Sequence, residues 1–106
     1  MNRVQTLNFR KDGDTVKLDV TDTTGRVQFN GPTSDDKSIL IWNSGSEEAF
    51  IEIGFSTVNA SLTTSMPIPA GVLIPLQAPD RAGDYLAAIC DTGQTTTLYI
   101  TPGFGS

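Results

Sequence analysis

The sequence of 106 residues contains no histidine and one cysteine, and both scarcities limit the chemistry open to it. Without histidine, Ser-His-Asp triads and most zinc sites are unavailable, so paired carboxylates are the main remaining route to catalysis. Cys90 is alone, so no internal disulfide can form. Its neighbours Ala88 and Ile89 are apolar and a nucleophilic cysteine usually needs a basic partner, so we expect Cys90 to pack inertly in a buried strand.

Basic residues are also few, with 7 Lys and Arg against 12 Asp and Glu and a formal net charge of -5. They are dispersed along the chain, whereas phosphate binding requires clustered Lys and Arg. We therefore expect neither a nucleic-acid partner nor binding to an anionic membrane surface. No apolar run has the length of a membrane helix, and the first residues lack the apolar segment of a signal peptide. These features predict a soluble protein made in the cytoplasm.

Short strand-like runs separated by turn residues occupy most of the chain. Thr15–Val20 alternates cleanly, with Val16, Leu18 and Val20 on one face and Lys17 and Asp19 on the other. Eight or nine such strands, about ten residues apart, predict an all-β chain over residues 1–106, organised as a single-domain antiparallel β-sandwich. We expect it to be jelly-roll-like with little helix.

The stretch Lys37–Val58 reads as the central hairpin, because the apolar runs Ile39–Trp42 and Ala49–Phe55 flank a short polar connection. The first run is apolar on both faces, which is typical of a strand covered on both sides. A polar turn after Phe9 predicts a second hairpin, between Val4–Phe9 and Thr15–Val20. Pro102 lacks a backbone donor, so we expect it to end the last strand and leave a loose tail at about 102–106.

The carboxylates offer two interpretations. Asp12 and Asp14 flank Gly13 in a predicted turn and are the best candidates for a calcium site, because Ca²⁺ prefers several oxygens from a flexible loop. The alternative is that Asp and Gly form turns and that the acidic turns keep the protein soluble. We favour this alternative, because no loop has EF-hand spacing. We therefore expect no metal and no cofactor. Glu52 is the one carboxylate within a predicted strand face, whereas glycosidase chemistry needs two, so we expect no catalytic residues and no enzyme.

Several aromatic side chains could pack in the core or anchor an interface. Tyr99 shares a face with Thr97 and Thr101, opposite Leu98 and Ile100, and is the better candidate for exposure. For Trp42 we favour core packing over a surface role, and Glu52 fits a solvated or interface-facing strand position. The residues that we expect at a protein interface are Trp42, Phe50, Glu52, Tyr99 and Phe104.

The order of short motifs from Ile39 onward resembles a known group of proteins. The motifs are IWNSG at Ile41–Gly45, AFIEIG at Ala49–Gly54, PIPAG at Pro67–Gly71, LAAI at Leu86–Ile89 and TLYITPG at Thr97–Gly103. In this order they resemble small proteins encoded among the virion genes of tailed bacteriophages. The resemblance covers about the last two thirds of the chain and does not include Met1–Lys37.

This resemblance implies a non-enzymatic structural protein of the virion, and within that class a capsid decoration or cement protein that stabilises the head shell. It further implies that the major capsid protein and other copies of the chain, as a dimer or trimer, are its partners. The protein would be made in the cytoplasm of the host bacterium and located on the capsid surface. The alternative is a carbohydrate- or receptor-binding module of a tail fibre or baseplate, with Trp42 or Tyr99 as a stacking platform and an acidic loop for calcium.

Overall fold

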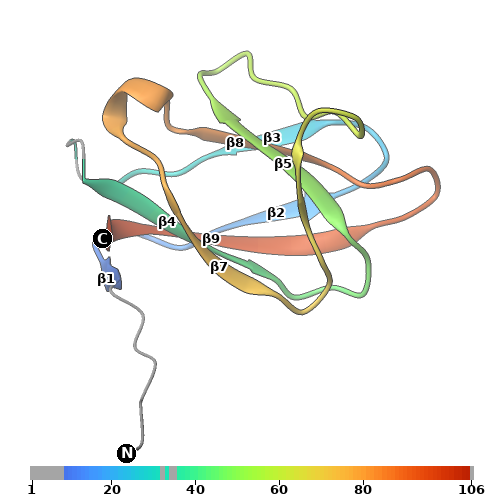
Figure 1. Ribbon diagram of the computed structural model, residues 1–106, viewed down its shortest axis with the longest axis horizontal. Helices are drawn as coiled ribbons and strands as arrows, with labels where there is room; N and C mark the ends of the chain where they lie inside the picture. Colours follow the sequence, from blue (N-terminus) through green and yellow to red (C-terminus); the bar gives the residue numbers. More distant parts are fainter. Residues whose placement is uncertain (1–8, 32, 34–35, 106) are drawn as a thin grey trace, which may run out of the picture.

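The computed structural model describes residues 9–31, 33 and 36–105, which form two antiparallel β-sheets around one core (Figure 1). The all-β antiparallel sandwich predicted from the sequence is confirmed. The strands of the described part are β1 (Phe9–Lys11), β2 (Val16–Val20), β3 (Gly25–Gln28), β4 (Lys37–Asn43), β5 (Ala49–Gly54), β6 (Met66–Ile68), β7 (Leu73–Gln77), β8 (Tyr85–Ile89) and β9 (Thr96–Gly105). A short 3-10 turn covers Asp80–Ala82. No helix in this part of the chain has the length and apolar character needed to cross a membrane.

The strand order is that of a jelly roll. Sheet A has the order β1-β9-β4-β7, with β2 also paired to β9, and sheet B has the order β3-β8-β5-β6. The chain changes sheet at nearly every connection from β2 onward, and only β5 and β6 are consecutive neighbours within one sheet. This interleaving joins the two sheets many times, and it confirms the jelly-roll-like arrangement expected from the spacing of the strands.

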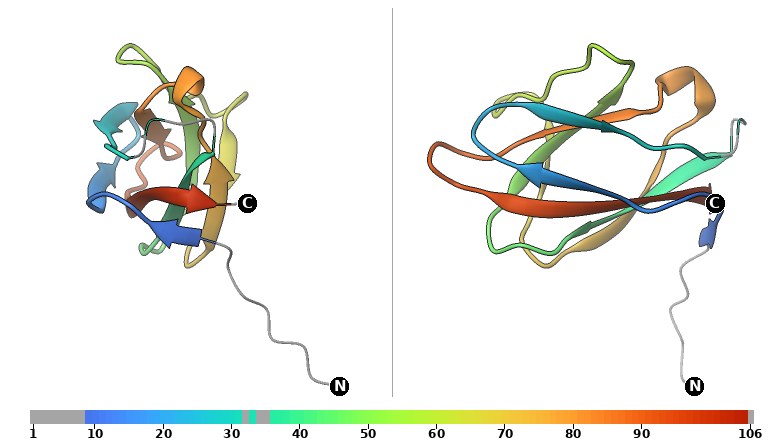
Figure 2. Two further views of the ribbon diagram at one scale, coloured as in Figure 1. Left: turned by 90° about the vertical axis from the view of Figure 1, so that its left-hand side faces the viewer. Right: turned by 180° about the vertical axis from the view of Figure 1, so that it is seen from behind.

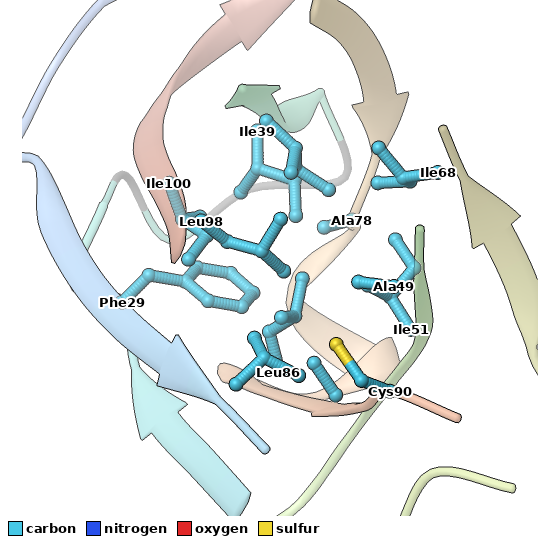
Figure 3. Packing of buried hydrophobic residues seen from close by; sticks show 13 residues of the cluster. Phe29, Ile39, Ala49, Ile51, Ile68, Ala78, Leu86, Cys90, Leu98 and Ile100 are labelled. Carbon is cyan, nitrogen blue, oxygen red and sulfur yellow. The ribbon is translucent and has the colours of Figure 1, made fainter. Parts of the chain in front are cut away.

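The central hairpin predicted for Lys37–Val58 is wrong. The strands β4 and β5 lie in opposite sheets, and the connection at 44–48 passes over one end of the sandwich. Ile39 of β4 and Ile51 of β5 point into the interior between the sheets, where the buried apolar side chains gather (Figure 3). A short polar connection between two apolar runs suits a hairpin or an arch equally. The arch is adopted because it places both apolar faces in the same core.

The first two strands do not form a hairpin either. Phe9 is the part of Val4–Phe9 that lies within the described residues, and β1 and β2 follow one another along the same side of β9 (Figure 2). Four residues, 12–15, separate Lys11 from Val16 on this edge, whereas two separate their partners Gly103 and Ile100. The extra residues form a bulge, where the backbone N–H of Asp12 donates to the oxygen of Pro102 over 3.0 Å.

The bulge explains why the predicted tail is also wrong. The strand β9 continues through Pro102 to Gly105 and pairs with both β1 and β4. The proline nitrogen cannot donate, but it faces the interrupted side of the ladder, where no partner strand requires a donor. Pro102 and Gly103 are buried, so residues 102–105 belong to the sheet.

Candidate interaction face on sheet A

The outer face of sheet A carries an aromatic pair, in which Trp42 is exposed and Tyr99 is partly buried. The register of β4 and β9 places Trp42 opposite Tyr99, and the two rings stack with centroids 5.6 Å apart and planes inclined by 25°. Inward side chains on the same strands, such as Ile41 and Ile100, are fully buried. Trp42 is 45% exposed, although its run is apolar on both faces. The strand is therefore covered on its inner side, while its outer side faces solvent.

Aliphatic side chains and hydroxyls extend this pair into a shallow groove of about 410 Å³. Leu73 lies opposite Trp42 on β7 and is 48% exposed. On the other flank the hydroxyls of Thr15 and Thr101 are hydrogen bonded over 2.7 Å. The residues that line the groove are Thr15, Leu40, Trp42, Leu73, Tyr99 and Thr101. We call this set the sheet A patch.

The face around the sheet A patch carries little charge. Beside the patch, Lys17 is opposite Tyr99 in the register of β2 and β9, and its ammonium lies 3.9 Å from the carboxylate of Asp19. These two charges oppose one another, whereas the whole chain has a net charge of -5. Protein interfaces have aromatic residues at their centre and few charged ones, so this face has the chemistry of a contact surface.

The structure separates the five residues predicted for an interface. Trp42 and Tyr99 meet on sheet A, whereas Phe50 and Glu52 point outward from sheet B, where Phe50 is opposite Pro67 and Ile89. Phe104 lies near the far end of β9, with the guanidinium carbon of Arg10 4.8 Å from its ring centroid. The prediction thus named two members of the patch and missed its aliphatic part. Leu40 could have been found, because it shares the outward side of β4 with Trp42 at period two.

The outer face of sheet B is partly covered by the segment 55–65, which we call the strap. Arg26 holds it with three hydrogen bonds, donating to the main-chain oxygens of Val58 and Ser56 at 2.9 Å and to the side chain of Asn59 at 3.1 Å. At its far end, Ser65 donates to the Glu52 carboxylate over 2.9 Å. Glu52 therefore anchors the strap, which leaves the outer face of sheet A as the more open of the two.

The remaining candidates from the sequence are the Asp12 and Asp14 pair and Cys90. Asp12 and Asp14 lie in the bulge between β1 and β2, and the described residues contain no group of three or more His, Cys, Asp or Glu placed to hold a metal ion. Cys90 is fully buried, and its N–H donates to the oxygen of Thr21 over 2.8 Å. Burial raises the pKa of the Cys90 thiol, and the nearby carboxylates of Glu47 and Asp22 raise it further.

The fold and the patch thus define a jelly-roll β-sandwich with one open apolar face, and solved structures of other proteins share this fold. No family model and no curated protein matches the chain. A protein of the Bacillus endospore appendages, which are disulfide-linked pili, superposes with a TM-score of 0.53 at 14% identity, covering 99% of this chain and 98% of that one. PirA superposes with a TM-score of 0.55 at 16% identity, covering 83% and 92%. At these identities the likeness shows the fold alone.

Proposed function

We propose that this chain is a non-enzymatic structural protein of a tailed-bacteriophage virion, which decorates the head by docking the outer face of sheet A on capsid subunits. The observation that carries the proposal is the exposed Trp42, stacked on Tyr99 within a face that has little charge, on an otherwise acidic protein. Large aromatic side chains at the centre of a desolvated contact supply much of the binding energy between proteins. The order of short motifs noted in the sequence supports the virion assignment.

The fold is compatible with this role. Jelly-roll sandwiches form viral capsid and lectin domains, and the endospore appendage protein with the same fold belongs to a pilus, which is also an ordered assembly. Many copies on a symmetric shell multiply a modest contact through avidity, so a standard interface of roughly 1,200–2,000 Å² suffices for stable decoration. Decoration would raise the free energy needed to separate neighbouring capsid subunits.

The test is binding of the purified protein to heads assembled without it. We expect saturable binding, added density at symmetric positions with sheet A facing the shell, and greater survival of the heads on heating. Trp42→Ala should weaken binding at least tenfold, as expected for a central aromatic contact. Phe55→Ala is the matched control, because Phe55 is an even more exposed aromatic, at 61%, on the strap. Unchanged binding by Trp42→Ala, or density with sheet A facing outward, would refute the docking face.

The exposed Trp42 beside Tyr99 also favours a second function, a carbohydrate- or receptor-binding module of a tail fibre or baseplate. A sugar ring presents an apolar face and a rim of hydroxyls, which suits an aromatic floor beside the Thr15 and Thr101 hydroxyls. Trp42 is the one tryptophan, so its fluorescence reports on the groove directly. A saturable change on titration with glycans, lost in Tyr99→Ala, would support this function, and sensitivity to chelators lost in Asp12→Asn would implicate calcium. Absence of any change across a glycan panel would count against it.

A further inference from the structure

The two edges of sheet A differ in how well they could accept another strand. At one edge, β7 contains Pro75, which has no backbone N–H. The N–H of Asn43 donates to the oxygen of Val72 over 3.0 Å, and that of Ala78 donates to the oxygen of Lys37 over 2.8 Å. The even-numbered residues of β7 therefore face β4, and Pro75 faces outward. This edge lacks a donor at its centre, which opposes pairing with another strand.

The other edge is formed along β2, which contains no proline. Among the described residues, β9 is the one strand that pairs with β2. The N–H of Ser44 donates to the oxygen of Thr97 over 2.9 Å, so the odd-numbered residues of β9 bond to β4 and the even-numbered ones bond to β2. The register then directs the even-numbered residues of β2 toward β9. The N–H and C=O groups of Lys17 and Asp19 point to the open side, where an added strand would pair.

The side chains at these two positions carry opposite charges. Both lie on the outer face of sheet A, with the Lys17 side chain 55% exposed and the Asp19 side chain 73% exposed, and the ammonium is 3.9 Å from the carboxylate. The carboxylate also accepts a hydrogen bond of 3.3 Å from the hydroxyl of Thr97. A cation and an anion two residues apart are self-complementary, because an antiparallel copy of the same strand presents them in the reverse order. The edge is therefore neutral on a chain with a net charge of -5.

We propose that two copies of the chain pair antiparallel through β2, about a two-fold axis at Leu18. In this register Lys17 of each copy is opposite Asp19 of the other, and each such pair exchanges both of its N–H···O bonds. The two Leu18 residues form the central pair without hydrogen bonds, in which side chains approach most closely. Leu18 is partly exposed at the edge of the core, so this contact removes apolar surface from water.

The charges select this register and this partner. A shift by two residues in one direction would place Lys17 opposite its own equivalent, and a shift in the other direction would do the same for Asp19. Like charges directly opposite one another destabilise a strand pair. A shift by one residue would oppose an outward-facing residue with one whose N–H and C=O already bond to β9. A second copy therefore fits the edge in one register, with both charges matched.

The pairing would also place two sheet A patches on one surface. A two-fold axis perpendicular to the joined sheet keeps the outer faces of both copies on the same side. The two β4 strands, which carry Trp42, would be separated by five strand spacings, or about 24 Å. A dimer would then dock through two patches at once, which multiplies a modest contact through avidity. The pairing itself does not depend on the proposed docking, because it concerns the protein alone.

Charge exchange tests the proposal by light scattering of the full-length chain over a range of concentrations. We expect a monomer–dimer equilibrium for the wild type. Asp19→Lys alone and Lys17→Glu alone should each weaken it about tenfold or more, because like charges would then be opposite. An equal mixture of the two variants should restore dimers, since each variant supplies the charge that the other needs. Both side chains are exposed, and thermal unfolding of each variant verifies that it folds.

The matched control is Glu48→Lys, which makes the same change of charge at an exposed position of the β4–β5 arch. It should leave dimerisation unchanged. A monomeric wild type over the whole range of concentrations would overturn the proposal. Equal weakening by Asp19→Lys and Glu48→Lys, or a mixture that associates no better than its components, would do so as well, because association would then use another surface or the net charge alone.

Mixed cross-linking provides an independent measurement. One chain carries Lys17→Cys and the other carries Asp19→Cys, at positions that the proposed pairing places about 5.5 Å apart between Cα atoms, within the range of a disulfide. The native Cys90 is buried and slow to react. Under mild oxidation we expect a disulfide-linked dimer that contains one chain of each kind. Glu48→Cys replaces Asp19→Cys as the control, and cross-linking to Asp19→Cys no greater than to Glu48→Cys would overturn the proposal.

Discussion

The side-chain amide of Asn43 donates a hydrogen bond of 2.9 Å to the main-chain oxygen of Ile68, which joins the end of β4 in sheet A to β6 in sheet B. The same nitrogen donates to the oxygen of Glu47, also at 2.9 Å. The amide oxygen accepts from the hydroxyl of Thr96 at 2.7 Å and from the N–H of Gly45 at 3.2 Å. Asn43 is fully buried, so this one amide satisfies the polar groups where the β4–β5 arch closes the sandwich.

Replacement of Asn43 should therefore be costly. Asn43→Ala leaves two donors and two acceptors without their partner, and we expect a loss of about 3 kcal/mol in the free energy of unfolding. Asn43→Asp has the same shape but directs a carboxylate at two carbonyl oxygens, so it should destabilise at least as much at neutral pH. Urea denaturation measures both, and the exposed Asn59→Ala should stay within about 0.5 kcal/mol of wild type. A loss below about 1 kcal/mol for Asn43→Ala would contradict the role of this amide.

Arg26 should control the strap more than the fold. Lysine keeps the charge but not the planar fork of donors, so Arg26→Lys should lose most of the bonds to Val58, Ser56 and Asn59. We expect global stability to fall by only about 1 kcal/mol. Hydrogen exchange of the Ala60 amide, which donates to the Thr24 hydroxyl, should accelerate at least tenfold. The matched variant Arg10→Lys keeps a cation over Phe104 and should leave exchange in the strap unchanged. Equal acceleration in the two variants would argue against Arg26 as the residue that holds the strap.

Leu98 and Tyr99 are neighbours on β9, and truncation should mainly reduce stability at Leu98 and mainly reduce binding at Tyr99. Leu98 is fully buried in the core, so Leu98→Ala should cost about 2–5 kcal/mol of stability. Tyr99 points outward and stacks on Trp42, so Tyr99→Ala should cost no more than about 1.5 kcal/mol. Head or glycan binding should show the reverse order, with Tyr99→Ala the more harmful in a folded protein. Comparable losses of stability at the two positions would place Tyr99 in the core.

The buried thiol gives the stability a dependence on alkaline pH. Because the pKa of Cys90 is raised in the folded state, the unfolded chain loses this proton first as the pH increases above about 8.5. The folded state then binds more protons than the unfolded state, so stability is retained below this pH and decreases above it. Thermal unfolding of Cys90→Ala should show a shallower decline between pH 8.5 and 10.5 than wild type. Identical slopes for the two proteins would exclude this contribution.

Much of the fold follows from local pattern alone. The alternation in Val16, Leu18 and Val20 predicts an inward face, and these residues pack in or against the core. Leu98 and Ile100 are likewise buried, as their strand pattern indicates. Such predictions succeed because a strand with one apolar face has a single way to bury it, whatever its partner. The jelly-roll-like sandwich was therefore accessible from strand spacing and turn residues.

Which strands pair with one another depends on contacts between residues far apart in the sequence. A polar connection such as 44–48 allows a hairpin or an arch, and the choice depends on burying the faces of β4 and β5 together in one core. Pro102 ends a strand by local rules, yet β9 continues through it because the bulge at 12–15 removes the need for a donor. The exposure of the sheet A patch is also a tertiary property. Trp42 belongs to a run that is apolar on both faces, and it is exposed because sheet B covers the other face of β4. Pairing and burial are long-range outcomes, and a single run of residues cannot determine them.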